Sequence, residues 1–305
     1  MKVVRFARPG TSESRVGIVT DDGVLDFSAA YRVYRLAADG CDVPLMCDPA
    51  DLLRAGLFAP EVFRATADFV RGHGLGETFT VKQPTLLSPL ARPPKIIALG
   101  RNYRAHALES GLGVPDEPIF FCKASTAVIG PQQPVVIKRD LTRVDPEVEL
   151  AVVIGERGAD IPRERAPSFV AGYTVLNDVT ARDMQKEDLS KSNPWFRSKG
   201  LDTFCPLGPC IVLPDEIQEP VELNLEMRVN GEVRQRDNTA SLMFKIPHLI
   251  EFISHFMTLE PGDIISTGTP EGMAPIKPGD VMEAEVERIG VLRNPVVAEA
   301  ESGRS

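Results

Sequence analysis

The chain has 305 residues, with 34 lysines and arginines against 43 aspartates and glutamates, which gives a formal net charge of −9. A chain of this length forms one large domain or two modest ones. The acidic balance argues against a broad phosphate-binding surface, so nucleic acid is not expected as the main partner. Because no run of 18 apolar residues occurs, no membrane-spanning segment is expected either.

The five cysteines are odd in number and show no CxxC spacing, which favours a reduced, cytoplasmic compartment. The amino-terminal residues lack the apolar core of a signal peptide, which fits the same expectation. With only four histidines, a histidine-rich zinc site is not expected. Any metal ion would be held mainly by oxygen atoms.

The first 90 residues are predicted to form a small α/β domain. Short strands are expected within residues 1–30, where Asp21-Asp22-Gly23 is typical of a hairpin turn. Residues 31–75 are more helical in pattern. A proline-punctuated stretch over residues 82–94 resembles a connection between domains. We therefore place a boundary near residue 90, with a second domain over residues 91–305.

Strand-like apolar runs dominate after residue 90. Helical patterns are fewer: a short helix that stops at Gly111, and a clear helix over residues 246–259 with Pro247 in its first turn. Asn230-Gly231 marks another hairpin. The pattern does not alternate strand and helix, so the chain is predicted to be α+β and strand-dominated.

Three carboxylates lie beside apolar strand patterns. Glu147 and Glu149 are two residues apart at the start of the run LAVVI, so both side chains share one face of a strand. Asp178 follows another apolar strand. Solvent-facing alternation would explain the two glutamates, and a helix N-cap would explain Asp178. Alternatively, the three would form an open oxygen site suited to Mg²⁺ or Mn²⁺.

Further candidates follow Asp178. Arg182 is four residues beyond Asp178, a spacing that an ordinary helical ion pair would explain, and Gln185 lies one turn later. Lys199 lies in the segment FRSKGLDTF, where a solvated loop lysine is the simplest interpretation. Each of these residues could instead face a substrate.

Two other segments carry possible chemistry. His106 and Glu109 have i,i+3 spacing, which puts both side chains on one helical face. The carboxylate could orient the imidazole as a general base, although a surface pair would show the same spacing. Thr269, in the turn TGTP, could help to hold an anion or could belong to an ordinary loop.

Taken in order, these motifs resemble the fumarylacetoacetate hydrolase superfamily. The segments are GRNYxxHxxE, FxKxxT, ExELAVVIG, GYTVxNDVTARDxQ, SKxLDTFCPLGP, VNGExRQ and GDIISTGTPxG. They run from Gly100 to Gly272, within a similarity that extends over about residues 95–297. Residues 1–90 resemble the shorter amino-terminal domain of many bacterial members. Pro146 departs from the family pattern, in which an aromatic residue or histidine often stands there.

The resemblance implies a mixed β-roll fold, a bound Mg²⁺ or Mn²⁺ ion and a homodimer. It implies that Glu147, Glu149 and Asp178 are the metal ligands, and that His106 and Glu109 form a dyad that activates water. It also implies that Arg182, Gln185 and Thr269 contact the substrate and that Lys199 stabilises negative charge during the reaction. Lys123 is a weaker correspondence.

The implied substrates are 2-oxo acids with a second carbonyl or carboxylate. The intact pair of His106 and Glu109 favours a hydrolase that cleaves a C–C bond in acylpyruvate-type 2,4-diketo acids. An oxaloacetate decarboxylase, or an isomerase or hydratase of 2-oxo-ene dioic acids, remains an alternative, because one site could serve each reaction. Specificity is expected in residues 112–117 and 185–197, where Lys186, Lys191 and Arg197 hint at a second anionic group on the substrate.

Overall fold

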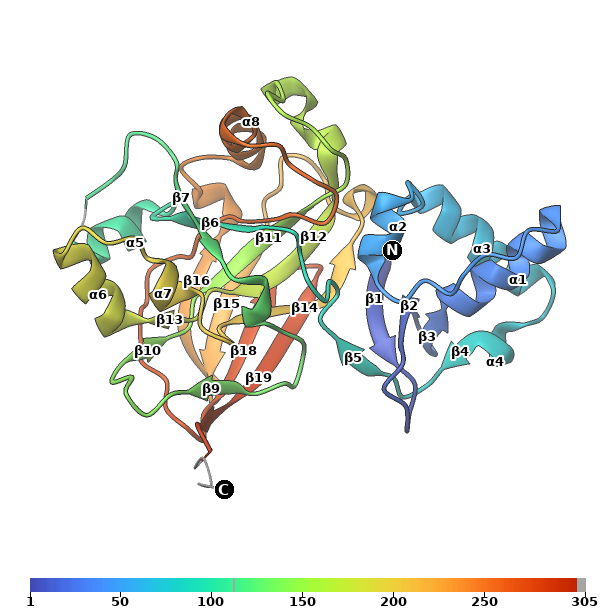
Figure 1. Ribbon diagram of the computed structural model, residues 1–305, viewed down its shortest axis with the longest axis horizontal. Coiled ribbons are helices and arrows are strands. Elements are labelled where there is room, and N and C mark those ends of the chain that lie inside the picture. Colours follow the sequence, from blue (N-terminus) through green and yellow to red (C-terminus); the bar gives the residue numbers. More distant parts are fainter. Residues whose placement is uncertain (112, 301–305) are drawn as a thin grey trace.

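A computed structural model describes residues 1–111 and 113–300. Strands outnumber helices and form large mixed sheets, which confirms the strand-dominated α+β class (Figure 1). Its first elements are β1 (Lys2–Ala7), β2 (Ser14–Thr20), β3 (Gly23–Asp26), α1 (Phe27–Asp39), α2 (Pro49–Arg54), α3 (Pro60–Gly72), α4 (Gly76–Phe79), β4 (Thr80–Val81) and β5 (Thr85–Leu87).

The remaining elements begin with a strand that follows the proline-rich stretch. They are β6 (Ile96–Gly100), α5 (Arg104–Glu109), β7 (Ile119–Lys123), β8 (Val128–Ile129), β9 (Val135–Ile137), β10 (Val144–Asp145), β11 (Val148–Ile154), β12 (Val170–Asn177), β13 (Thr180–Ala181), α6 (Arg182–Ser190), α7 (Phe196–Lys199), β14 (Cys205–Val212), β15 (Asn224–Val229), β16 (Glu232–Asn238), α8 (Ile246–Phe256), β17 (Ile264–Ser266), β18 (Val281–Val286) and β19 (Gly290–Ala298).

Both predicted hairpins are present. β2 and β3 pair antiparallel across the turn before Gly23, and β15 and β16 pair across Asn230-Gly231. The predicted helix over residues 246–259 is α8, which ends three residues earlier, at Phe256, and has Pro247 in its first turn. Local turn chemistry and apolar periodicity therefore specify these elements.

One hydrogen-bonded sheet crosses the position of the predicted domain boundary. Among the described residues its order is β4-β3-β2-β1-β14-β12-β11-β17-β6-β7, with β5 on β1 and β8 on β14. β1 pairs with β14 through Lys2 and Val3, which join Val212 and Ile211. The first 90 residues nevertheless pack mainly around an apolar cluster of their own, so the division near residue 90 stays a prediction.

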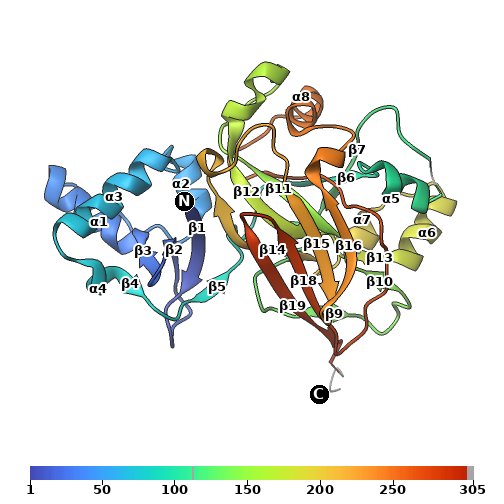
Figure 2. The same ribbon diagram turned by 180° about the vertical axis from the view of Figure 1, so that it is seen from behind.

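The strands β11 and β12 form the centre of this sheet and are buried along their whole length. Leu150 and Val152 face one apolar cluster, while Ala151 and Val153 face another. Burial on both faces explains why these strands read as continuous apolar runs. A second sheet, ordered β16-β15-β18-β19-β9, packs against them through β15 and β18 (Figure 2).

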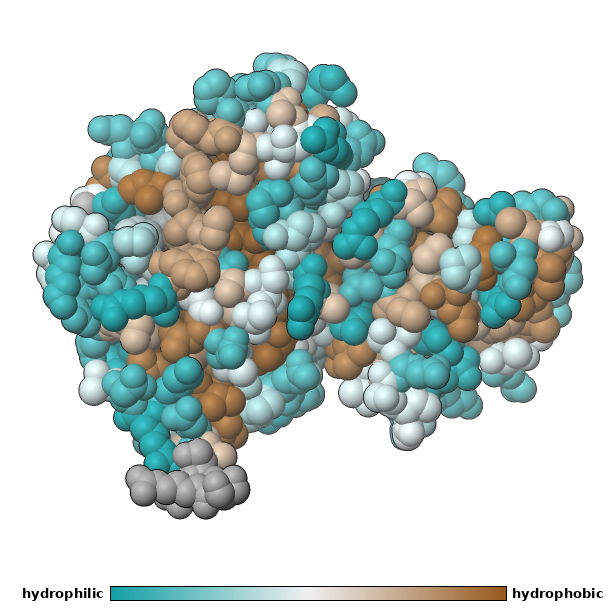
Figure 3. Space-filling view, viewed as in Figure 1, coloured by the Kyte–Doolittle hydropathy of each residue, from teal (hydrophilic) through white to brown (hydrophobic). Residues whose placement is uncertain are grey.

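Hydrophobic side chains also gather on the surface over α8 and the β7 edge of the sheet (Figure 3). Phe256 is 60% exposed there and contacts the rings of Phe120 and Phe252. In the part of the chain that is described, no helix combines the length and the apolar character needed to cross a lipid bilayer. All five cysteines are free thiols.

Candidate active site

Four strand ends meet at one edge of the central sheet. β6 and β17 run parallel, and Ser266 at the end of β17 lies opposite Ala98 of β6 and Ala151 of β11. Because β11 runs antiparallel to β12, its first residue, Val148, lies opposite Asn177, the last residue of β12. Residues at the start of β11 and those just after β6, β12 and β17 therefore share one location.

Glu147, Glu149 and Asp178 converge at this edge. One carboxylate oxygen from each lies within 4.8 Å of the others, and all three side chains are buried. Solvent-facing alternation of the two glutamates is therefore wrong. The N-cap interpretation of Asp178 is also wrong, because two residues of β13 precede α6, whose N-cap position is Ala181.

Two buried lysines contact this acidic cluster. Nζ of Lys199 lies 2.7 Å from Oε2 of Glu147 and 2.5 Å from Oδ2 of Asp178, so the interpretation as a solvated loop lysine is wrong. Nζ of Lys123 lies 2.6 Å from Oδ1 of Asp178. Burial disfavours the charged form of Lys199. The negative charges of Asp178 and Glu147 have the larger combined effect, so the pKa of Lys199 is raised above its ordinary value.

Arg182 provides the third buried cation. Its guanidinium pairs with Glu147, lies 2.8 Å from Oδ2 of Asp145 and donates to Oε1 of Gln185 at 2.7 Å. The helical ion pair with Asp178 is therefore wrong, because Asp178 precedes the helix and binds lysines instead. These three contacts hold the guanidinium in place beside the acidic cluster.

The two glutamates have opposite electrostatic surroundings. Burial opposes ionisation of Glu147, but Lys199 and Arg182 hold the pKa of Glu147 well below its ordinary value. Burial and the nearby charge of Asp178 instead raise the pKa of Glu149 to about 8. Glu149 accepts hydrogen bonds from the Ser266 hydroxyl, at 2.5 Å, and from the Gly268 amide, at 2.9 Å.

This donor set fits a hard divalent cation. All three groups offer carboxylate oxygens, which Mg²⁺ and Mn²⁺ prefer to nitrogen or sulfur ligands. The pKa of Glu149 is raised first by burial and then by the charge of Asp178, and a cation bound among the carboxylates would offset both effects. The cluster could therefore hold Mg²⁺ or Mn²⁺.

His106 lies on α5, close to this cluster. Nδ1 of His106 is 3.6 Å from Oε2 of Glu109 and has no hydrogen-bond partner among the described residues. The imidazole is buried, so an exposed surface pair is excluded. Burial lowers the pKa of His106, and the charges of Arg182 and Lys199 lower it further. A neutral imidazole is therefore available near neutral pH.

Thr269 is held by a residue that the sequence analysis did not select. The Thr269 hydroxyl donates to the carbonyl oxygen of Val148, at 2.9 Å, and accepts from Nε2 of Gln235, at 2.9 Å. Gln235 is buried, and its Oε1 accepts the amide of Val148 at 3.0 Å. It therefore joins the start of β11 to the TGTP turn. It occurs in the motif VNGExRQ, but nothing in the local pattern showed that its side chain turns inward.

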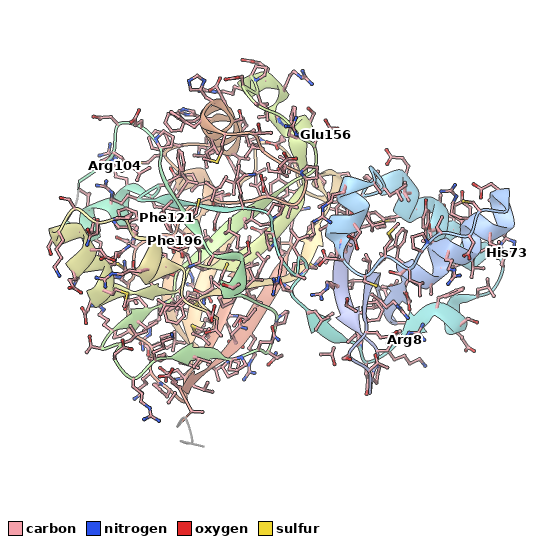
Figure 4. The ribbon with its side chains drawn as sticks, in the orientation of Figure 1. Arg8, His73, Arg104, Phe121, Glu156 and Phe196 are labelled. Carbon is pink, nitrogen blue, oxygen red and sulfur yellow. The ribbon has the colours of Figure 1, made fainter. Side chains whose placement is uncertain are left out.

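A pocket opens beside the cluster. Its lining includes residues selected from the sequence: His106, Glu147, Arg182, Gln185, Lys199 and Thr269. Phe121 and Trp195 complete one wall, with Lys199 Nζ 5.2 Å from the centre of the Phe121 ring. Figure 4 shows Phe121 on β7 beside Phe196, at the start of α7. This inner pocket therefore combines cations, a neutral imidazole and an aromatic wall.

Most of the chain is similar to known proteins. The family model described as "Fumarylacetoacetate (FAA) hydrolase C-terminal" matches residues 95–297. A mitochondrial oxaloacetate tautomerase of Xenopus laevis is 38% identical over 306 residues, covering 97% of this chain and 90% of that protein.

Two solved structures are similar over nearly the whole chain. A 5-carboxymethyl-2-hydroxymuconate delta-isomerase from Mycobacterium smegmatis is 36% identical, with a TM-score of 0.73 over 99% of this chain and 100% of that one. A maleylpyruvate hydrolase from Sphingobium sp., in complex with manganese(II) and pyruvate, is 31% identical, with a TM-score of 0.74 over 98% and 100%.

Proposed function

Because this chain belongs to the fumarylacetoacetate hydrolase family, we propose that it is a divalent-metal-dependent enzyme that moves the C3 proton of 2-oxo acids, interconverting their keto and enol forms. One observation carries the proposal. A buried imidazole, whose Nδ1 has no hydrogen-bond partner within residues 1–111 and 113–300, lines the same pocket as three groups that can bind a carboxylate and a keto oxygen. The imidazole is His106, and the three groups are Arg182, Gln185 and Lys199.

Removing a proton from C3 leaves negative charge on the 2-oxo oxygen. Lys199 and Arg182 are charged and buried, so their attraction for that oxygen is stronger than it would be in water. The lowered pKa of His106 leaves its imidazole neutral and able to accept the proton. Return of the proton to the oxygen or to C3 completes the interconversion.

Glu147, Glu149 and Asp178 would hold the Mg²⁺ or Mn²⁺ ion. When bound, such an ion supplies Lewis-acid polarisation of the 2-oxo group. The relatives support this assignment. The Xenopus laevis protein is named an oxaloacetate tautomerase, and the Sphingobium enzyme is described with manganese and pyruvate, the simplest 2-oxo acid of this kind.

Hydrolysis of a C–C bond is the second candidate, favoured by the position of Glu109. With Glu109 orienting it, His106 would take a proton from water as the oxygen adds to the distal carbonyl of an acylpyruvate. The C3–C4 bond would then break, releasing a carboxylic acid and, after protonation at C3, pyruvate. Proton transfer at C3 is shared by both candidates.

The deciding experiment follows oxaloacetate and acetylpyruvate by NMR in deuterated buffer with Mg²⁺, each beside an enzyme-free control. Faster deuterium exchange at C3 of oxaloacetate, with acetylpyruvate left intact, supports the tautomerase. Release of acetate and pyruvate from acetylpyruvate supports the hydrolase, and conversion of oxaloacetate to pyruvate supports a decarboxylase.

Substitution of the base provides the control. His106→Gln should slow C3 exchange about 100-fold or more, the usual contribution of a general base. His73→Gln changes an exposed histidine at the end of α3 and should leave the rate unchanged. Wild-type exchange no faster than in the enzyme-free control would contradict the proposed function.

A further inference from the structure

The guanidinium of Arg182 has more donors than its protein partners use. A guanidinium carries five N–H groups. Nε lies 2.8 Å from Oδ2 of Asp145, Nη1 donates to Oε1 of Gln185 at 2.7 Å, and Nη2 donates to Glu147. Within residues 1–111 and 113–300, one N–H group on each terminal nitrogen is therefore left without a partner. A carboxylate pairs with a guanidinium through two N–H groups, so Arg182 keeps the donors that a 2-oxo acid needs.

Asp145 is a buried carboxylate with both oxygens engaged. While Oδ2 contacts Arg182, Oδ1 accepts a hydrogen bond from Nε of Arg143 at 3.0 Å. The backbone supports this arrangement, because Asp145 on β10 lies opposite Thr180 on β13. The amide of Arg182 also donates to the carbonyl oxygen of Arg143, at 2.9 Å. The Asp145 carboxylate therefore cannot turn away from the guanidinium without breaking an ion pair.

Two of the basic residues expected to contact a second anionic group have partners on the protein itself. Lys191 pairs with Glu187, and Arg197 pairs with Asp188. Leu112, in the other segment expected to set specificity, lies outside the described residues. The carboxylates that orient the guanidinium come instead from β10 and from the residue that precedes β11.

The two carboxylates that pair with Arg182 differ in their other contacts. Glu147 belongs to the acidic cluster proposed to hold the divalent cation, and Asp145 does not. A cation bound there would weaken the attraction between Glu147 and Arg182, because two positive charges would then share one carboxylate. Asp145 keeps a separate oxygen for each of its two arginines. It is therefore the partner that can keep the guanidinium oriented when the cation is bound.

We propose that Asp145 is a positioning residue, which holds Arg182 so that the two remaining N–H groups of its guanidinium face the carboxylate of a 2-oxo acid. This inference rests on the proposed function, in which Arg182 binds the substrate. The lining of the inner pocket, as far as the structure describes it, includes Arg182 but not Asp145. Asp145 thus acts through Arg182 and has no contact with the reacting atoms.

The chain provides its own probe of ligand binding. Trp195 is the one tryptophan of the sequence, and it lines the inner pocket together with Arg182. Its fluorescence should therefore change when a ligand enters. The ligands are pyruvate and pyruvamide, each titrated in the presence of Mg²⁺. Both have the same 2-oxo group, but pyruvamide has a neutral amide in place of the carboxylate, so the ratio of the two Kd values measures the preference for the carboxylate.

Asp145→Asn should reduce this preference about tenfold, the effect expected for one lost hydrogen bond to a charged group. Asparagine has one acceptor oxygen and no charge, so it cannot hold both arginines. In an Arg182→Lys background, Asp145→Asn should have little further effect, because the guanidinium through which it acts is already gone. A residue with a structural role alone would weaken binding in both backgrounds.

Asp183→Asn is the matched control. Asp183 lies in the first turn of α6, and its Oδ2 accepts the hydroxyl of Thr142 at 2.5 Å. It therefore joins α6 to the segment before β10 without contacting the guanidinium, and Asp183→Asn should bind both ligands as the wild type does. Asp145→Glu keeps the buried negative charge, which guards against loss of the fold, but moves the carboxylate by one methylene. It should also lower the preference for pyruvate.

The outcomes separate the two proposals. If Asp145→Asn or Asp145→Glu is folded and keeps the wild-type preference, Asp145 does not position Arg182, and the proposed function is untouched. Equal weakening of pyruvate and pyruvamide would have the same meaning. If the wild type binds both ligands equally well, there is no carboxylate contact for Asp145 to support, and this inference alone is overturned. If neither ligand binds, the inner pocket does not accept 2-oxo compounds, and both proposals are overturned.

Discussion

Oε2 of Glu109 lies 3.6 Å from Nδ1 of His106, beyond hydrogen-bond distance, while the same carboxylate accepts the amide of Gly272 at 3.1 Å. Glu109 thus ties α5 to the segment that follows β17, and Nδ1 of His106 has no hydrogen-bond partner in the part of the chain that the structure describes. A small rotation of either side chain would form the dyad. His106 could therefore act in two ways. While Glu109 stays bound to the Gly272 amide, the imidazole would act alone as the base at C3. Once paired with Glu109, it would act as the base that activates water.

Glu109→Gln tests this separation. The amide oxygen of glutamine can still accept the Gly272 and Met273 amides, but the side chain loses the charge that would stabilise an imidazolium. We expect any hydrolysis of acetylpyruvate to fall about 100-fold and C3 exchange of oxaloacetate to fall less than about tenfold. NMR progress curves for both substrates measure the two rates.

The matched control is Glu61→Gln, which removes an exposed carboxylate of α3 outside the linings of the inner pocket and of the neighbouring pocket that Glu109 lines. Its rates should equal those of the wild type. Equal loss of both reactions in Glu109→Gln would mean that the carboxylate supports His106 in every reaction, and the division of roles would be wrong.

The acidic cluster predicts that metal binding stabilises the fold. A cation that binds only the folded protein at 100 times its Kd adds about 2.7 kcal/mol to the free energy of unfolding. We expect Mg²⁺ or Mn²⁺ to raise the Tm of the wild type. Glu147→Ala and Asp178→Ala should abolish this rise, whatever their Tm without metal. Glu156→Gln, at an exposed position beyond β11, is the control and should keep the full shift.

Glu149 predicts a pH dependence of stability in protein freed of metal with a chelator. Its pKa is raised to about 8 in the folded protein, against 4.5 for an ordinary glutamate. Between these values the folded state binds the extra proton, so the free energy of unfolding falls as pH rises. Below about pH 6.5, the lowered pKa of His106 acts in the opposite direction. Measurements from pH 7 to pH 8 therefore isolate Glu149.

Glu149→Gln removes this titration but keeps an acceptor for Ser266 and Gly268. From pH 7 to pH 8 the wild type should lose about 1 kcal/mol relative to the variant, measured by urea unfolding. Saturating Mg²⁺ should reduce the difference, since a bound cation holds the carboxylate ionised. Parallel pH profiles for the two proteins would contradict the raised pKa.

The sequence predicted elements whose signals are local. The turns at Gly23 and at Asn230-Gly231 and the apolar face of α8 follow from neighbouring residues alone. The order of strands in the sheet was not predictable in the same way. That β1 would pair with β14, more than 200 residues away, depends on backbone hydrogen bonds that no sequence period records.

The site also combines features that local sequence predicts with features that depend on long-range strand pairing. Spacing placed Glu147 and Glu149 on one face of a strand but could not decide whether that face was buried. That the face is buried follows from the pairing of β11 with β12. The register places Val148 opposite Asn177, so Asp178, the next residue, lies beside Glu147 and Glu149. Only the combination of motifs in one order favoured a metal site over the two ordinary local explanations, solvent-facing alternation for the glutamates and a helix N-cap for Asp178.

Gln235 illustrates the part that could not be predicted and gives a final test. It lies on β16, where most neighbouring side chains are exposed, yet its side-chain amide hydrogen-bonds Val148, Thr269 and Pro270.

Gln235→Leu would leave buried polar groups without partners, at about 1–3 kcal/mol for each unsatisfied group. We expect urea unfolding to show a loss of about 2–4 kcal/mol, and KM for the 2-oxo acid to rise because Thr269 lines the pocket. Gln218→Leu, at an exposed position, should change neither quantity. If the Gln235→Leu variant is destabilised but its KM is unchanged, Gln235 has a structural role alone. Substrate binding then does not depend on the position of Thr269.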